Sequence, residues 1–268
     1  MRKKQESHLI ILIMLFFNSN YYSQNFYNEG VDEYLNGSEL KAIDLLTKAI
    51  ESKQEIVKAY MFRGAAKIYT NDFFGSIQDL QTSLKLDSSD YKTYLYLGRN
   101  YFYQGFQQTA IKYYNKAINL NPKDADLYDQ RATTKGLLND VEGGIKDENM
   151  AISLVDSVSD YYINRGVMYS ALHKYQDAIK DFDKAIQIDS LPQAYSNRGV
   201  ARAQLGLHKE AISDYTKGIE LLPLAIDLPY LRGISYKAIG EIKKACLDIS
   251  KSADMGYPEA IKEKKNCN

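Results

Sequence analysis

The sequence predicts an all-α protein, a solenoid of about seven helix-turn-helix units with a short capping helix at its C-terminal end. Two observations predict this fold class. Small residues recur every 33 or 34 positions along most of the chain, and apolar residues between them follow the three-and-four spacing of helices. Self-similarity at such a period is typical of architectures in which each unit packs only against its neighbours.

The composition excludes several other classes. The 268 residues include 34 Lys or Arg and 34 Asp or Glu, so the formal net charge is zero. With 23 Tyr, such a chain is unlike a disordered one, which has few aromatic residues and a large net charge. Two Cys exclude a disulfide-dense mini-fold. The absence of excess basic charge predicts that the protein does not bind nucleic acid.

Residues 1–23 are predicted to be a signal peptide. Residues 1–4 are basic after the initial Met, and residues 9–17 are all apolar. Nine apolar residues are far fewer than the roughly 20 that span a bilayer. Ser23 is a suitable small residue before a cleavage site, but Tyr21 is bulky where a small side chain is preferred. An uncleaved membrane anchor is therefore the alternative.

The repeat is aligned on a column of small residues where two helices must approach closely. Its members are Gly30, Gly64, Gly98, Ala132, Gly166, Gly199 and Gly233. A second column, seven residues later, is mostly Gly or Asn and suits a residue with positive φ at the end of a helix. Its members are Gly37, Asn71, Gly105, Asn139, His173, Gly206 and Gly240. Each unit is therefore predicted to be a helix, a tight turn and a second helix.

This pattern resembles the tetratricopeptide repeat (TPR), which has 34 residues in two antiparallel helices. The third unit carries the family's markers in order, with Gly98, Tyr101, Ala110, Tyr114 and Pro122 among them. The resemblance implies a right-handed superhelix with a concave face. It covers residues 24–257 as about seven repeats, and residues 258–268 are left as a C-terminal capping helix and tail.

The fourth unit departs most from the pattern. It has Ala132 in the small-residue column, Gly136 inside its first helix, and Glu148 where other units carry an apolar residue. One interpretation is drift in a tolerant repeat. The other is a soft joint between units one to three and units five to seven.

Five units share an Arg before the small-residue column and an Asp sixteen residues later. In the other two units neither residue is present, which indicates a structural ion pair between the two helices of one unit. The predicted pairs are Arg63–Asp79, Arg131–Asp147, Arg165–Asp181, Arg198–Asp214 and Arg232–Asp248.

The two cysteines are a possible disulfide. Cys246 stands at an apolar position of the last unit, and Cys267 lies in the tail after Pro258, which can open a short helix. In an oxidising compartment a bond between them would tie down the polar cap that a repeat array needs. The alternative is a buried inert thiol with a frayed tail.

By the resemblance, partners would lie in a groove formed by the first helices. Its lining would be aromatic and basic in units one to three, and acidic in units four and five. An extended peptide could use Tyr side chains as rigid anchors, whereas the alternative is a solvated helix face. The candidates are Tyr27, Tyr34, Tyr69, Lys92, Leu95, Arg99, Tyr103, Asp126, Asp129 and Asp160.

The sequence contains no motif for catalysis, metal binding or a cofactor. Its glycines are not clustered as in a phosphate-binding loop, and its three His have no Cys or carboxylate at metal-ligand spacing. We therefore expect no catalytic residue, no metal and no cofactor.

The expected function is a non-catalytic scaffold or adaptor that binds proteins or extended peptides. A resemblance to exported bacterial repeat proteins implies a periplasmic or cell-surface location. One alternative is a membrane-anchored assembly factor that retains its N-terminal segment, and a remote one is an enzyme with an unrecognised site. The partner and the oligomeric state cannot be read from the residues.

Overall fold

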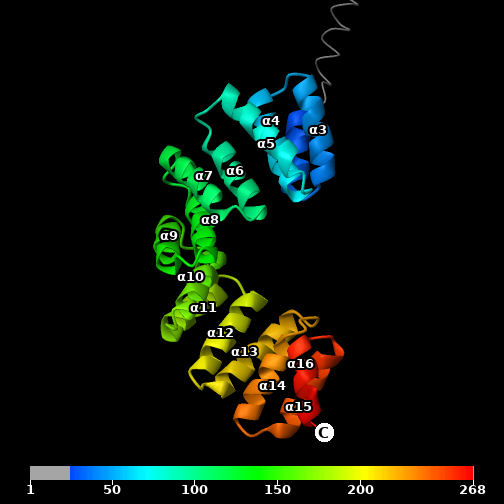
Figure 1. The fold of residues 1–268 in the computed structure, drawn as a ribbon, viewed down its shortest axis with the longest axis vertical. Helices are drawn as coiled ribbons and strands as arrows, with labels where there is room; N and C mark the ends of the chain where they lie inside the picture. Colours follow the sequence, from blue (N-terminus) through cyan, green and yellow to red (C-terminus); the bar gives the residue numbers. More distant parts are fainter. Residues whose placement is uncertain (1–24, 268) are drawn as a thin grey trace, which may run out of the picture. The chain divides into compact units, whose positions relative to one another are not determined.

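The structure is a computed structural model that describes residues 25–267, and within that range all regular elements are helices (Figure 1). The predicted signal peptide, residues 1–23, lies outside the described residues. The chain forms two compact units with a boundary between Gly105 and Phe106. We call residues 25–105 the N-terminal unit and residues 106–267 the C-terminal unit. Among the described helices none is long and apolar enough to cross a membrane.

In the N-terminal unit each helix packs against the next one along the chain, and the alternate helices α2, α4 and α6 also contact one another in sequence. The helices are α2 (Phe26–Leu35), α3 (Glu39–Glu51), α4 (Ile56–Tyr69), α5 (Phe73–Leu86) and α6 (Tyr91–Tyr103).

The C-terminal unit repeats the same arrangement, with contacts between consecutive helices and between alternate helices from α8 to α14. Its helices are α7 (Gln107–Leu120), α8 (Ala125–Leu137), α9 (Val141–Leu154), α10 (Ser159–Ala171), α11 (Tyr175–Ile188), α12 (Pro192–Gln204), α13 (His208–Leu221), α14 (Leu228–Ala238), α15 (Ile242–Asp254) and α16 (Pro258–Glu263), followed by the 3₁₀ helix η1 (Lys264–Cys267).

The predicted turn column adopts a left-handed backbone conformation throughout. All seven residues have φ between +58° and +81°, including Asn71, Asn139 and His173. Such a residue ends one helix and lets the next begin two positions later. After His173, for example, the backbone N–H of Lys174 donates to the carbonyl of Tyr169 at 2.9 Å. The two helices of a repeat are therefore joined by a tight turn.

The small-residue column is explained by close packing within each helix pair. A Cβ at Gly166 would lie 2.7 Å from a ring carbon of Phe182, and one at Gly199 equally close to the ring of Tyr215. Phe182 and Tyr215 are almost completely buried. Only a residue without a side chain lets these rings fill the space between the helices.

The last helix pair is covered by α16. Ala260 is fully buried in a cluster with Ile249 and Ala253 of α15. Tyr257, just before α16, packs its ring 5.3 Å from that of Tyr230. The C-terminal segment thus covers apolar surface that a further repeat would otherwise bury.

Candidate functional site

Three of the four aromatic candidates of the N-terminal unit lie in one cluster. We define the aromatic cluster as Tyr34, Phe62, Tyr69, Tyr96 and Tyr103. The ring of Tyr34 lies 5.7 Å from Phe62 and 6.3 Å from both Tyr69 and Tyr96, and Tyr69 lies 6.0 Å from Tyr103. These are ordinary separations for attractive aromatic pairs. Tyr69 and Tyr103 remain 45% and 54% exposed, so the cluster has a buried base and an accessible edge.

The other candidates in this unit differ in accessibility. Lys92 is exposed at the start of α6, and Arg99 is half-buried with its guanidinium 5.8 Å from the Tyr96 ring centre. Leu95 is only 6% exposed. The expectation that Leu95 lines an open groove is therefore wrong for this residue.

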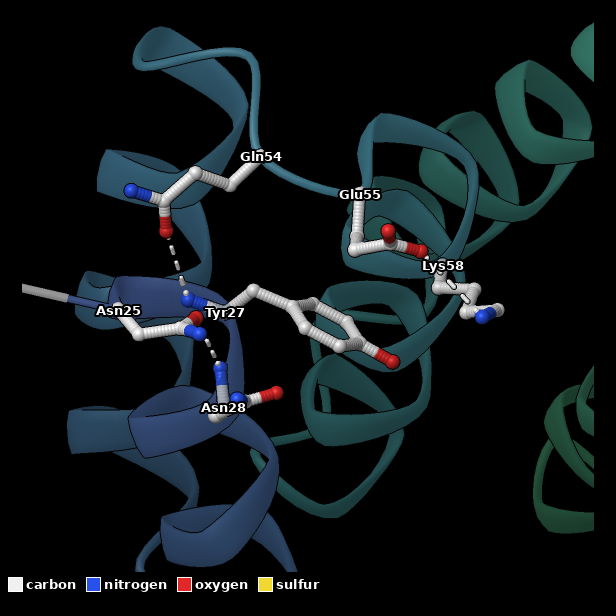
Figure 2. Close-up of a pocket in the computed structure, with 6 residues that line it drawn as sticks. All are labelled: Asn25, Tyr27, Asn28, Gln54, Glu55 and Lys58. Carbon is white, nitrogen blue, oxygen red and sulfur yellow. Dashed lines mark hydrogen bonds and ion pairs between the residues drawn. The ribbon is translucent and has the colours of Figure 1, made fainter.

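Tyr27 lines two open pockets at the N-terminal end of the first helices, and Figure 2 shows the first of them. One pocket, of about 560 Å³, is lined by polar side chains, some of which also accept hydrogen bonds from the local backbone. Gln54 Oε1 accepts from the backbone N–H of Tyr27 at 3.2 Å, and Lys58 Nζ lies 3.3 Å from Glu55. The second pocket, of about 770 Å³, extends from Tyr27 to Lys92. The Tyr27 ring therefore lies among side chains of both signs, which include Lys58, Lys92, Glu55, Asp87 and Asp90.

The acidic candidates lie in the C-terminal unit. Asp126 and Asp129 are on α8, whereas Asp160 is in the first turn of α10. Asp160 is exposed, but Asp129 is 9% exposed and accepts a 2.8 Å hydrogen bond from Nδ2 of Asn164. Burial raises the pKa of Asp129, and the amide donors Asn164 and Gln130 offset part of that rise.

A second carboxyl group lies behind Asp129. Glu148 of α9 is fully buried in the position where other repeats place a large apolar side chain. Burial, and secondly the Asp129 carboxylate, raise the pKa of Glu148 from 4.5 to about 10. Glu148 is therefore neutral at pH 7, and this neutral form is what allows a carboxyl group to occupy the core.

An apolar pocket adjoins the acidic residues. It has a volume of about 290 Å³ and lies between α8 and α10. Its lining residues are Thr133, Gly136, Leu137, Val141, Asn164, Val167, Met168 and Ala171. Asn164 thus contacts both the pocket and Asp129, so the two features are parts of one surface.

The five Arg and Asp residues lie side by side within their repeats. Arg165 donates from Nε to Asp181 Oδ2 at 2.8 Å and from Nη2 to Oδ1 at 2.6 Å, and the other four Arg contact their Asp over 2.6–3.2 Å. The five Asp side chains are buried. Each arrangement is a bidentate ion pair, which fixes the orientation of both side chains.

The remaining nitrogen of each Arg bonds to the preceding repeat, a contact that the sequence did not reveal. Nη1 of Arg165 donates to Asn149 Oδ1 at 2.7 Å, and Nη1 of Arg63 donates to Thr47 Oγ1 at 3.0 Å. The five acceptors stand at one position of the second helix and are Thr47, Asn115, Asn149, Asp183 and Thr216. Each Arg therefore joins two repeats as well as two helices.

Three of the buried Asp have a second cationic partner that the sequence reasoning also missed. Lys67, Lys135 and Arg202 lie 2.7–2.8 Å from Asp79, Asp147 and Asp214. Each cation follows the repeat's Arg by four residues, so it lies one helical turn further along the same helix face. The basic residue four positions after the Arg is therefore the sequence feature that could have predicted this second contact.

Cys246 and Cys267 form a disulfide, with their Cα atoms 5.3 Å apart. It joins α15 to η1 at the end of the cap. Cys246 is half-buried, less enclosed than its position in the apolar column led us to expect. Within residues 25–267 no group of three or more His, Cys, Asp or Glu side chains is arranged to hold a metal ion.

Comparison with known proteins agrees with the repeat architecture. Family models of the tetratricopeptide repeat match residues 91–124, 159–190 and 192–223. No curated protein matches the sequence.

Three solved structures illustrate the similarity of fold. MamA is 28% identical with a TM-score of 0.55, over 59% of this chain and 92% of its own. YrrB, described as a TPR protein with an unusual peptide-binding site, is 18% identical with a TM-score of 0.58, over 69% and 97%. PilW, described as a type IV pilus biogenesis factor, is 15% identical with a TM-score of 0.70, over 78% and 98%. With its seven periodic helix pairs and three family matches, the chain is a tetratricopeptide repeat protein.

Proposed function

We propose that this protein is a non-catalytic scaffold of the bacterial cell envelope that binds proteins or extended peptides through the faces of its first helices. The observation that carries the proposal is the aromatic cluster, whose exposed edge is formed by Tyr69 and Tyr103. Exposed aromatic side chains that are already held by neighbouring rings bind a partner with little loss of conformational entropy. YrrB, whose fold this chain shares, is described as having a peptide-binding site.

The envelope location is supported by the basic and apolar N-terminal sequence and by the Cys246–Cys267 disulfide. Structural disulfides persist in oxidising compartments and are rare in the bacterial cytosol. The alternative, a membrane-anchored assembly factor, keeps residues 1–23 on the mature protein. N-terminal sequencing of the protein recovered from cell fractions separates the two: a start near residue 24 supports export with cleavage, and a start at Met1 supports the anchor.

Site-specific photo-crosslinking tests the binding surface. A photo-reactive residue replaces Tyr103 of α6 or Thr133 of α8, and matched controls replace the exposed Gln78 of α5 and Lys146 of α9. The proposal predicts that the first-helix positions capture a partner and that the second-helix controls do not. Equal capture from Gln78 and Lys146 would contradict it.

A further inference from the structure

Two positions that line the apolar pocket between α8 and α10 carry smaller residues than the N-terminal repeats have there. Gly136 stands four residues after the small-residue column, where repeats one to three carry Tyr34, Ile68 and Phe102. Ala171 stands five after it, where repeats two and three carry Tyr69 and Tyr103. Larger side chains at these two positions would occupy the 290 Å³ pocket that the small ones leave open.

Packing does not require a glycine at position 136. A Cβ there would meet only Met168 Cε at 3.5 Å, an ordinary contact distance. At Gly144, by contrast, a Cβ would lie 2.8 Å from Met168 Sδ and 3.1 Å from the carbonyl of Ala132. Gly136 is the last but one residue of α8, and the close packing that requires a glycine elsewhere does not apply to it.

Carboxylates flank the pocket on both helices at the same distance. Asp129 precedes Gly136 by seven residues on α8, and Asp160 precedes Val167 by seven on α10. Seven residues are two helical turns, or about 10 Å along each helix. Asp160 is exposed, whereas Asp129 is only 9% exposed and its two carboxylate oxygens already accept from Asn164 and Gln130. One end of this surface is thus apolar and the other is anionic.

We propose that this surface binds a partner segment that places an apolar side chain in the pocket and a Lys or Arg beside the exposed Asp160. An extended chain advances about 3.3 Å per residue, so the basic residue lies about three positions from the apolar one. The inference rests on the proposed function and adds the chemistry of the segment that is recognised.

The test compares two substitutions at one position. Gly136→Phe fills the pocket, whereas Gly136→Ala restores helix propensity and leaves most of the pocket open. A random-peptide library is panned on the full chain, and peptides that Gly136→Phe retains equally are discarded. The remaining peptides are expected to pair an apolar residue with Lys or Arg about three positions away. Their affinity should fall at least about tenfold for Gly136→Phe and stay within about twofold for Gly136→Ala.

A variant that removes the negative charge tests whether the partner's basic residue is recognised. Asp160→Asn keeps the side-chain shape and should lower the affinity of the selected peptides, while making their binding less dependent on salt. Circular dichroism checks that every variant is folded. The inference is overturned when no peptide distinguishes wild type from Gly136→Phe, or when the selected peptides lack a basic residue. The inference is also overturned when a partner captured by crosslinking at Tyr103 binds Gly136→Phe as tightly as wild type. That result would leave the proposed function unaffected.

Discussion

Arg165 and Asp181 form a bidentate ion pair between α10 and α11, in which Nε and Nη2 donate to the two carboxylate oxygens at 2.8 and 2.6 Å. The guanidinium also lies over the ring of Tyr162, with its carbon 5.6 Å from the ring centre. Its third nitrogen reaches Asn149 in the preceding repeat. One side chain thus connects α9, α10 and α11. The ion pair and the bond to the preceding repeat recur in four other repeats, and the ring contact recurs in three of them.

Removal of either member of this pair is expected to destabilise the fold strongly. Arg165→Ala leaves a buried Asp181 carboxylate without its main partner, and Asp181→Ala leaves the guanidinium unpaired. Each change should lower the free energy of unfolding by about 3–5 kcal/mol. The double variant should cost clearly less than the sum, because both single changes lose the same interaction. Urea denaturation measures all three, and additive losses would show that the two residues act independently.

The bond between repeats is tested in α7, which offers its own control. Asn115 accepts a 2.6 Å hydrogen bond from Arg131 Nη1, whereas Asn119, one turn later, is an exposed residue of the same type. Both gain the same helix propensity on change to Ala. We expect Asn115→Ala to be less stable than Asn119→Ala by about 1 kcal/mol. Equal midpoints in urea would mean that the bond contributes nothing to coupling between repeats.

Glu148 predicts an unusual dependence of stability on pH. Its pKa is about 10 in the folded protein and near 4.5 when exposed, so the folded state holds a proton that the unfolded state releases as pH rises between these values. The contribution of Glu148 is therefore greatest below about pH 4.5 and is lost on going towards pH 10.

The matched variants are Glu148→Gln, which does not ionise, and Glu148→Leu, which restores the residue type that Leu46 and Leu80 provide in other repeats. Relative to wild type, both should become more stable as the pH is raised from about 5 to about 8. Urea midpoints at the two pH values measure this shift. A constant difference between wild type and Glu148→Gln would mean that Glu148 titrates normally.

The disulfide is expected to stabilise the C-terminal cap. Free-thiol counting on the denatured, unreduced protein should find none. Cys267→Ser should lower stability by about 3 kcal/mol, the usual effect of a bridge that closes a loop of this size. Adding Cys246→Ser should then change little, because the bond is already lost. Two free thiols in the mature protein would contradict the account.

Periodicity made the repeat and its turn column predictable. The Gly column and the paired Arg and Asp recur with the same identity in most units, so their alignment reveals which positions face one another. Gly166 could be assigned to a close helix contact because only a residue without a side chain suits that place. Alignment does not reveal a contact where the residue type varies between repeats. The acceptors Thr47, Asn149 and Asp183 have in common only a side-chain oxygen at one position of the repeat.

Other features depend on neighbours that the repeat pattern does not specify. Phe62 and Tyr96 complete the aromatic cluster, although the positions they occupy were assigned no role in the groove. Leu95 was expected in the groove, yet it is buried. Gly136 stood out as a departure from the pattern, but the pocket beside it depends on Val167, Met168 and Ala171 of the next repeat. Gly136 can therefore be recognised as unusual from the sequence, but the pocket beside it cannot.

The most direct test of the central claim measures how tightly a crosslinked partner, once identified, binds three forms of the protein. These are wild type, the double variant Tyr69→Ala/Tyr103→Ala, and Phe74→Ala, which removes a 73% exposed aromatic ring from the second helix α5. We predict at least about a tenfold loss of affinity for the double variant and no change for Phe74→Ala. Unchanged affinity of the double variant, or an equal loss for Phe74→Ala, would contradict recognition through the first-helix faces.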